Sequence, residues 1–205
     1  MKKALCLVLA ALISAFILAG CNNADPSVKS SSSAASGRSD KPGSGIPDYV
    51  DADALAHRSY ELRYLLAQQK FDSPDDISAS ALVQFCFCHL YYDDLTDMPT
   101  SGNRIREATV DDIKVQILKY FGSVSTDLTK ADLYNRGKGV FEMWEPLYGT
   151  DIYYDASVAA AGDDTYKVTT VFYNDPAKTE RLGKTVLTVE DLEGHVVIRK
   201  LTSAK

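Results

Sequence analysis

The sequence predicts an α+β domain in which N-terminal helices pack on one face of a curved antiparallel meander sheet of about five strands. Three observations lead to this expectation. Apolar residues recur at helical spacing from about residue 46 to residue 121, β-branched and aromatic runs follow from residue 140 to residue 201, and short turn signals separate those runs. Helices followed by strands are typical of the α+β class, and short loops favour antiparallel neighbours.

Capping residues mark the start of each expected helix. Asp51, Ser73 and Thr109 each precede a helical pattern, and their side chains can accept hydrogen bonds from free backbone N–H groups. Pro74 suits the first position of the second helix. Gly122 follows the third helix and is placed for a left-handed cap. The expected helices cover about 51–70, 73–92 and 109–121.

The expected strands are bounded by Gly, Pro, Asn and Asp, which are typical turn residues. A short helical turn around residues 129–134 is expected before the first strand. The strands span Val140–Trp144, Ile152–Ala160, Tyr166–Tyr173, Thr185–Val189 and Val196–Leu201.

The N-terminus has the features of a lipoprotein leader. Lys2 and Lys3 precede Ala4–Ala19, 16 uncharged residues, which is a signal-peptide length and short of the roughly 20 apolar residues of a spanning helix. Leu18-Ala19-Gly20-Cys21 resembles the lipobox of bacterial lipoproteins. The resemblance implies cleavage before Cys21, a diacylglyceryl group on its thiol and, in many species, an acyl chain such as palmitate on its amino group. An uncleaved spanning helix and ordinary secretion are the alternatives.

Three parts of the chain follow from this leader. Residues 1–20 are the expected signal peptide. Residues 21–45 form a lipidated tether rich in Ser and Gly, which is expected to be disordered because it has too few apolar side chains to bury. Residues 46–205 suit a single α+β domain. The expected location is the extracytoplasmic face of the bacterial cell membrane, with the lipid bilayer contacted through acylated Cys21.

The charge of the chain argues against a nucleic-acid partner. The formal net charge is −6, and cleavage before Cys21 would remove two of the 22 basic residues and none of the 28 acidic residues, giving −8. Binding to nucleic acid requires clustered Lys and Arg that replace counterions. No polybasic grip on anionic lipid is expected either.

The segment Phe85-Cys86-Phe87-Cys88-His89 is the main candidate for metal or redox chemistry. A metal site would combine Cys86 or Cys88 with His89 and Asp93, since residues 89 and 93 share a helix face. The paired spacings of structural zinc sites are absent, and two cysteines two apart on a helix diverge. Free cysteines among phenylalanines are also ordinary core residues. No metal and no cofactor is therefore expected.

Aromatic residues beside carboxylates suggest a binding surface. Tyr91-Tyr92-Asp93-Asp94, with Asp97, could serve a sugar or calcium ion, but the Gly and terminal Glu of a helix–loop–helix calcium site are missing. Strand alternation sends Glu142 outward, away from the face of Phe141 and Met143. An exposed aromatic sheet face favours binding over catalysis. The candidate surface consists of Tyr91, Tyr92, Trp144, Tyr153 and Tyr154.

No constellation of residues indicates an enzyme. His57, His89 and His195 lie in different expected elements, and no nucleophile elbow, zinc-protease helix, P-loop or dinucleotide fingerprint occurs. Carboxylate pairs such as Glu142 with Glu145 could act as general acid and base on a glycan, but their separation cannot be read from the sequence.

The segment from Val110 to Leu201, with Tyr120-Phe121-Gly122 before a strand meander, is similar in layout to uncharacterised envelope lipoproteins of Gram-positive bacteria. It also resembles secreted inhibitors of cell-wall endopeptidases. No functional residues match either group. We expect a non-catalytic binding or inhibitory module that acts on a protein partner in the cell envelope through an exposed patch of acidic and aromatic residues. Two alternatives stay open: a cell-wall glycan or peptide hydrolase using strand carboxylates, and a lipoprotein that binds a small ligand.

Overall fold

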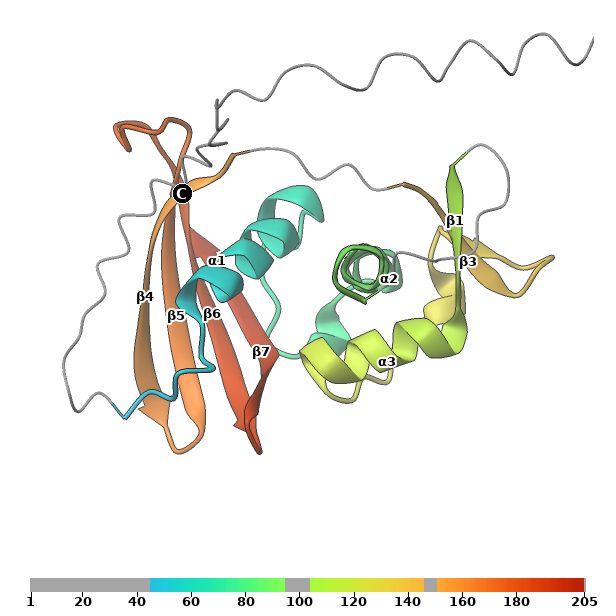
Figure 1. The fold of residues 1–205 in the computed structure, drawn as a ribbon, viewed down its shortest axis with the longest axis horizontal. Helices are drawn as coiled ribbons and strands as arrows, with labels where there is room; N and C mark the ends of the chain where they lie inside the picture. The colour runs from blue at the N-terminus through green and yellow to red at the C-terminus, as the bar shows by residue number, and fades with distance from the viewer. Residues whose placement is uncertain (1–44, 95–103, 146–150, 205) are drawn as a thin grey trace, which may run out of the picture. The chain divides into compact units, whose positions relative to one another are not determined.

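The computed structural model describes residues 45–94, 104–145 and 151–204. These ranges belong to one compact unit, Gly43–Lys205. They contain three α-helices and two antiparallel sheets, so the predicted α+β class is confirmed (Figure 1). The expected signal peptide, Cys21 and nearly all of the expected tether lie outside the described residues.

Short helical turns interrupt or extend the α-helices. In chain order, the helical elements are α1 (Ala52–Tyr60), the π-helical turn η1 (Glu61–Leu65), the 3-10 turn η2 (Pro74–Asp76), α2 (Ala79–His89), the π-helical turn η3 (Leu90–Asp94), α3 (Val110–Phe121) and the 3-10 turn η4 (Leu128–Lys130). The strands are β1 (Ile105–Thr109), β2 (Tyr134–Asn135), β3 (Val140–Trp144), β4 (Tyr153–Gly162), β5 (Thr165–Tyr173), β6 (Arg181–Leu192) and β7 (His195–Ala204).

The first helix starts as predicted and ends sooner. The Asp51 carboxylate accepts hydrogen bonds from the backbone N–H groups of Asp53 and Ala54, at 2.9 and 3.3 Å. The helix changes to a π-helical turn after Tyr60 and stops at Leu65, before the expected end near Lys70. Ala67 has a φ of +55°, which turns the chain out of the helical course.

The second expected helix is divided into two pieces. The Ser73 hydroxyl and the Asp76 carboxylate form a capping box around the short turn η2. Ile77 is then extended and buried, so its side chain enters the core and breaks the helix. The Ser78 hydroxyl accepts a hydrogen bond from the Ala81 N–H and starts α2 afresh.

The third helix begins with the predicted cap and ends differently. Thr109 and Asp112 form a capping box, with the Asp112 N–H donating to the Thr109 hydroxyl at 3.1 Å. Gly122 has a φ of +73° and a ψ of −137°, so the expected left-handed cap is wrong. The Arg199 guanidinium of β7 instead donates to the Phe121 carbonyl at 3.0 Å and ties the helix end to the sheet.

The five strands expected in one sheet are divided between two sheets. β3 lies in a three-stranded sheet of order β1-β3-β2, while β4, β5, β6 and β7 form an antiparallel meander in chain order. The prediction of one five-stranded sheet is therefore wrong, although all five strands exist. β1 and β2 were not expected. They give β3 a neighbour on each side, so it does not join the meander.

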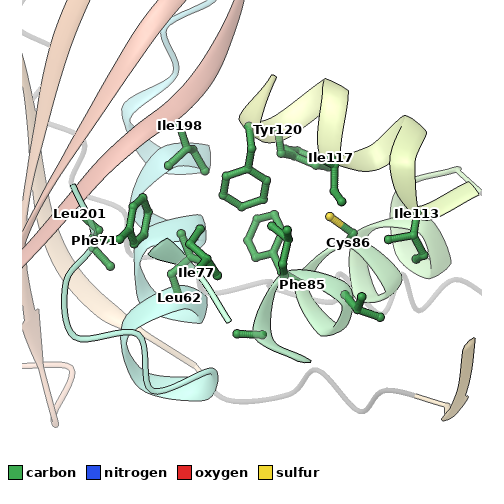
Figure 2. Close-up of a cluster of buried hydrophobic side chains, with 14 of the residues drawn as sticks. Leu62, Phe71, Ile77, Phe85, Cys86, Ile113, Ile117, Tyr120, Ile198 and Leu201 are labelled. Carbon is green, nitrogen blue, oxygen red and sulfur yellow. The ribbon is translucent and has the colours of Figure 1, made fainter. Parts of the chain in front are cut away.

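One cluster of buried apolar side chains joins the helices to the four-stranded sheet (Figure 2). α1 contacts β4, β5 and β6, and α3 contacts both α2 and β7. Phe85 of α2 meets Tyr120 of α3 edge to face, with 5.5 Å between the ring centroids. Phe71 forms an isolated antiparallel bridge with Leu201 of β7. This core fixes the helices against one sheet, and no described helix covers the outer face of either sheet (Figure 1).

Candidate functional site

The outer face of the three-stranded sheet displays an exposed tryptophan. Phe141 is fully buried, so strand alternation turns Glu142 and Trp144 to the opposite side of β3. Trp144 is 64% exposed and lies opposite Ile105 of β1. We call this surface the Trp144 face; it consists of Ile105, Glu107, Lys138, Glu142 and Trp144.

Two carboxylates of the Trp144 face share one ammonium group. Glu107 and Glu142 lie directly opposite each other in β1 and β3. The Lys138 Nζ lies 2.7 Å from the Glu107 Oε1 and 2.6 Å from the Glu142 Oε1, which offsets the repulsion of two like charges across the strand pair. The Asn135 amide also donates to Glu142, at 2.7 Å. The acidic pair is therefore held in place beside Trp144.

Two strand carboxylates, Glu142 and Asp155, have lowered pKa values. Hydrogen bonds from Lys138 and then from Asn135 lower the pKa of Glu142. In β4, the ion pair with Lys178, helped by the Tyr173 hydroxyl, lowers the pKa of Asp155. A general acid at neutral pH needs a carboxyl pKa that is raised. These two groups suit ionic contacts with a cationic surface better than proton donation.

Tyr91 and Tyr92 lie beside the three-stranded sheet but away from the Trp144 face. Their rings meet at 4.9 Å between centroids, and the Arg106 guanidinium lies 5.4 Å from the centroid of Tyr91. Arg106 also forms a short ion pair with Glu145. Arg106 lies opposite Met143 on β3, whereas Trp144 points to the other side. The two tyrosines and Trp144 therefore lie on opposite sides of the β1–β3 pair.

Tyr153 and Tyr154 belong to the other sheet and point to opposite sides of β4. Tyr154 faces α1, where its ring meets His57 at 5.5 Å and its hydroxyl donates to the Asp53 carboxylate at 3.2 Å. Desolvation and the charge of Asp53 raise the pKa of Tyr154 to about 12. Tyr153 lies opposite Tyr173 on the outer side of the sheet. The five predicted surface residues therefore do not form one surface, although the rings of Tyr91 and Tyr92 contact each other.

The cysteine–histidine segment is part of the core. Cys86 and Cys88 are buried, and burial raises the pKa of the Cys86 thiol well above its usual value. The His89 ring packs between Phe85 and Tyr120, at 4.4 and 4.6 Å. Across residues 45–94, 104–145 and 151–204, no group of three metal-ligating side chains converges. The side chains of Asp93 and Asp97 lie outside the described residues.

The structure reveals two features that sequence reasoning missed. The His89 Nε2 lies 2.8 Å from the Glu61 Oε2, and the two residues are 28 positions apart. Lys138 joins Glu107 to Glu142 through β1, a strand that was not expected. No local pattern pointed to either contact, because Lys138 lies in the turn before β3 and the i, i+4 rule applies to helices.

His57 and His195 do not join His89 in a common site. His57 lies against Tyr154, and His195 is exposed at the start of β7, opposite Leu192.

In the described part of the chain, no helix combines the length and apolar character needed to cross a bilayer.

The chain matches no protein-family model. Comparisons with curated proteins and with solved structures also returned no match. No residue roles are therefore carried over from a relative, and the function is argued from the surfaces described above.

Proposed function

We propose that the protein is a membrane-anchored extracytoplasmic lipoprotein whose folded domain is a non-catalytic binding or inhibitory module for a protein partner in the cell envelope. Acyl chains on Cys21 anchor it to the bilayer, and the Ser/Gly-rich tether of residues 21–45 separates the domain from the membrane surface. The partner binds the Trp144 face.

The exposure of Trp144 is the observation that carries this proposal. An indole that is 64% exposed leaves a large apolar surface in water, at the end of β3, where β1 pairs with the strand as far as Trp144. Tryptophan is among the residues enriched at the energetic centres of protein interfaces, because its large rigid ring buries much area at low entropic cost. Because the backbone of β3 is ordered before binding, less conformational entropy is lost when the partner binds, and the affinity is higher.

The charged side chains around Trp144 indicate the character of the partner. Glu107 and Glu142 with Lys138 carry one net negative charge next to the indole. The pKa of Glu142 is lowered, so its carboxylate stays ionised through the neutral range. The matching partner surface has an apolar pocket for the indole and a basic rim, which suits electrostatic complementarity with an acidic protein.

Site-specific photo-crosslinking in intact cells tests the proposal. A photoreactive residue at position 144 should give a crosslinked protein of defined mass, whereas the same residue at Val115 should not. Val115 is a matched control because it is 61% exposed but lies on α3. The captured protein should then bind the purified full-length chain, with affinity lowered about tenfold or more by Trp144→Ala and unchanged by Val115→Ala.

Two results would overturn the proposal. One is a position-144 crosslink pattern indistinguishable from that at position 115. The other is turnover of cell-wall material by the purified chain that is lost in Glu142→Gln, since this result would assign the strand carboxylates to catalysis.

A further inference from the structure

The strand β4 is an edge strand with one open side. The four-stranded sheet has the order β4-β5-β6-β7, so β5 is the hydrogen-bonded neighbour of β4 and the opposite side faces outward (Figure 1). The other edge strand is partly covered, because Phe71 and Leu201 exchange two backbone hydrogen bonds of 3.0 Å. No described residue makes such a bond to the outer side of β4. An open edge of this kind is a template for an added strand.

The composition of β4 leaves this edge unguarded. From Ala156 to Gly162 the strand reads Ala-Ser-Val-Ala-Ala-Ala-Gly, with no charge and no proline. Lysine, proline and bulges are the usual devices that prevent strand addition. Here the Lys178 ammonium covers the beginning of the strand, where it donates to the Tyr154 carbonyl at 2.7 Å and pairs with Asp155. A register shift occurs near the far end, between Ala160 and Gly162. The open part without a register shift is Ala156–Ala160, five residues or roughly 17 Å.

The small side chains of this segment are also poorly suited to stabilise a strand by themselves. Alanine and glycine are depleted in strands because they offer little area to pack against their neighbours. Ser157, Ala159 and Ala160 are exposed. These small side chains add little stability to β4, and they leave room for another backbone to approach its edge closely.

Acidic residues lie beyond both ends of β4. Asp163 and Asp164 are exposed in the turn that follows β4, and Asp151 is exposed just before it. None of the ion pairs within the described ranges includes these three residues. Asp53 of α1 adds a further carboxylate near the beginning of the strand, where it accepts the Tyr154 hydroxyl.

This charge pattern selects against a second copy of the chain. Antiparallel pairing of two β4 strands would place the Asp163–Asp164 turn of each copy near the Asp151 end of the other. Parallel pairing would place the Asp151 ends of the two copies side by side, and likewise the two Asp163–Asp164 turns. Both arrangements bring like charges together, and like charges across strands are destabilising. A strand with basic ends meets opposite charge at both ends in either orientation.

We infer that the β4 edge binds an extended peptide segment of about seven residues, with small or β-branched residues in the middle and Lys or Arg at both ends, which adds to the sheet as a fifth strand. Backbone hydrogen bonds supply much of the affinity, and the flanking carboxylates supply the selection for basic ends. The surface is separate from the Trp144 face, because β4 and β3 belong to different sheets. The proposal for one site can therefore be refuted without affecting the proposal for the other.

Binding of a synthetic peptide to the full-length, detergent-solubilised chain tests the inference. The probe is fluorescent Lys-Thr-Val-Thr-Val-Thr-Val-Lys, and the control carries Glu in place of both Lys residues. We expect the Lys-ended probe to bind at least tenfold more tightly than the control, and its affinity to fall several-fold when ionic strength is raised from about 0.05 to about 0.3 M. Hydrogen exchange of the amides of β4 should slow on binding.

A substitution on the edge separates strand addition from general attraction to an acidic protein. Ser157 is exposed and lies opposite Thr169 of β5. Ser157→Lys should weaken probe binding at least tenfold, whereas Val115→Lys, which adds the same charge on α3, should change it far less, and Ser157→Thr and Trp144→Ala should leave it unchanged. Two further probes carry methyl groups on alternate backbone nitrogens, each on a different set. The probe whose methyl groups point away from β4 should still bind the unaltered chain, and the other probe should not. This measurement does not depend on the folding of a variant.

Four outcomes would overturn the inference. These are equal binding of the Lys-ended and Glu-ended peptides, equal binding of the two methylated probes, exchange protection located outside β4, and a dimer of the chain that Ser157→Lys dissociates. The last result would assign the edge to a second copy. Loss of crosslinking at position 144 would bear on the proposed function alone.

Discussion

The imidazole Nε2 of His89 lies 2.8 Å from the carboxylate Oε2 of Glu61, and this contact joins the end of α2 to the end of α1. Both residues stand where an α-helix changes to a π-helical turn, since Glu61 begins η1 and η3 follows His89. Their side chains are only 11% and 15% exposed. The pair is thus a buried polar link between two helices, set beside the aromatic rings of Phe85 and Tyr120.

Removing one member of this pair should destabilise the domain. Glu61→Leu leaves the His89 ring without its acceptor in a desolvated position, so we expect a loss of about 2–3 kcal/mol in the free energy of unfolding, measured by urea denaturation. The exposed pair of Asp111 and Lys114 is the control, and Asp111→Ala should change stability by less than about 0.5 kcal/mol. Equal effects of the two substitutions would contradict a structural role for the buried pair.

Gly183 is needed because of a close approach by Tyr64. A Cβ added at this buried position of β6 would overlap the Tyr64 hydroxyl and lie 3.1 Å from the Ala204 carbonyl oxygen. Gly183→Ala should therefore cost about 1–3 kcal/mol of stability. In a Tyr64→Phe background the same substitution should cost at least about 1 kcal/mol less, because the overlapping oxygen is gone. Additive effects in this double-mutant cycle would show that another contact is responsible.

The stability of the domain should fall between pH 10 and pH 12. Desolvation and Asp53 raise the pKa of Tyr154 to about 12, from the ordinary value of 10.0. The unfolded state therefore loses this proton first, and the stabilisation present below about pH 10 disappears as the pH approaches 12. In urea denaturation at pH 9, 10 and 11, Tyr154→Phe should show a shallower decline than the unaltered chain. An unchanged slope would mean that Tyr154 does not contribute.

Cysteine substitutions test the proposed anchor. Cys21→Ser should release the protein from the membrane fraction and remove the mass of the acyl chains, because one residue carries the attachment. Cys6→Ser is the matched control, since Cys6 lies within the expected signal peptide and should be absent from the mature chain. Mass spectrometry and membrane fractionation provide the measurements. Membrane retention of the Cys21→Ser protein, with no lipid mass on either variant, would rule out lipidation.

Several elements were predictable because they depend on residues close together in the chain. Thr109 and Asp112 form the capping box of α3 within a single helical turn. The turns at Gly162 and Gly194 lie between consecutive antiparallel strands, as their turn signals predict. The Trp144 exposure followed from strand alternation, since the side chain points away from the face of Phe141. Each of these outcomes depends on interactions over a few residues.

Other features depended on contacts between distant segments. β1 contains Arg106 and Glu107 and has no strong strand signal, yet it pairs with β3 along five residues. That pairing separates β3 from the meander and directs Trp144 and Tyr91 to different sides. The Glu61–His89 contact likewise depends on how α1 and α2 pack.

The sequence by itself determined the α+β class, the caps of α1 and α3, the existence of the five strands from Val140 onward and the expectation of a lipid anchor, because caps, turns and apolar periodicity act locally. Tertiary structure decided which strands share a sheet, which face each aromatic residue occupies and which edge is left open. The physical reason is that strand partners and buried polar pairs are selected by packing over the whole domain, and the free energy of that packing is not encoded in any short segment.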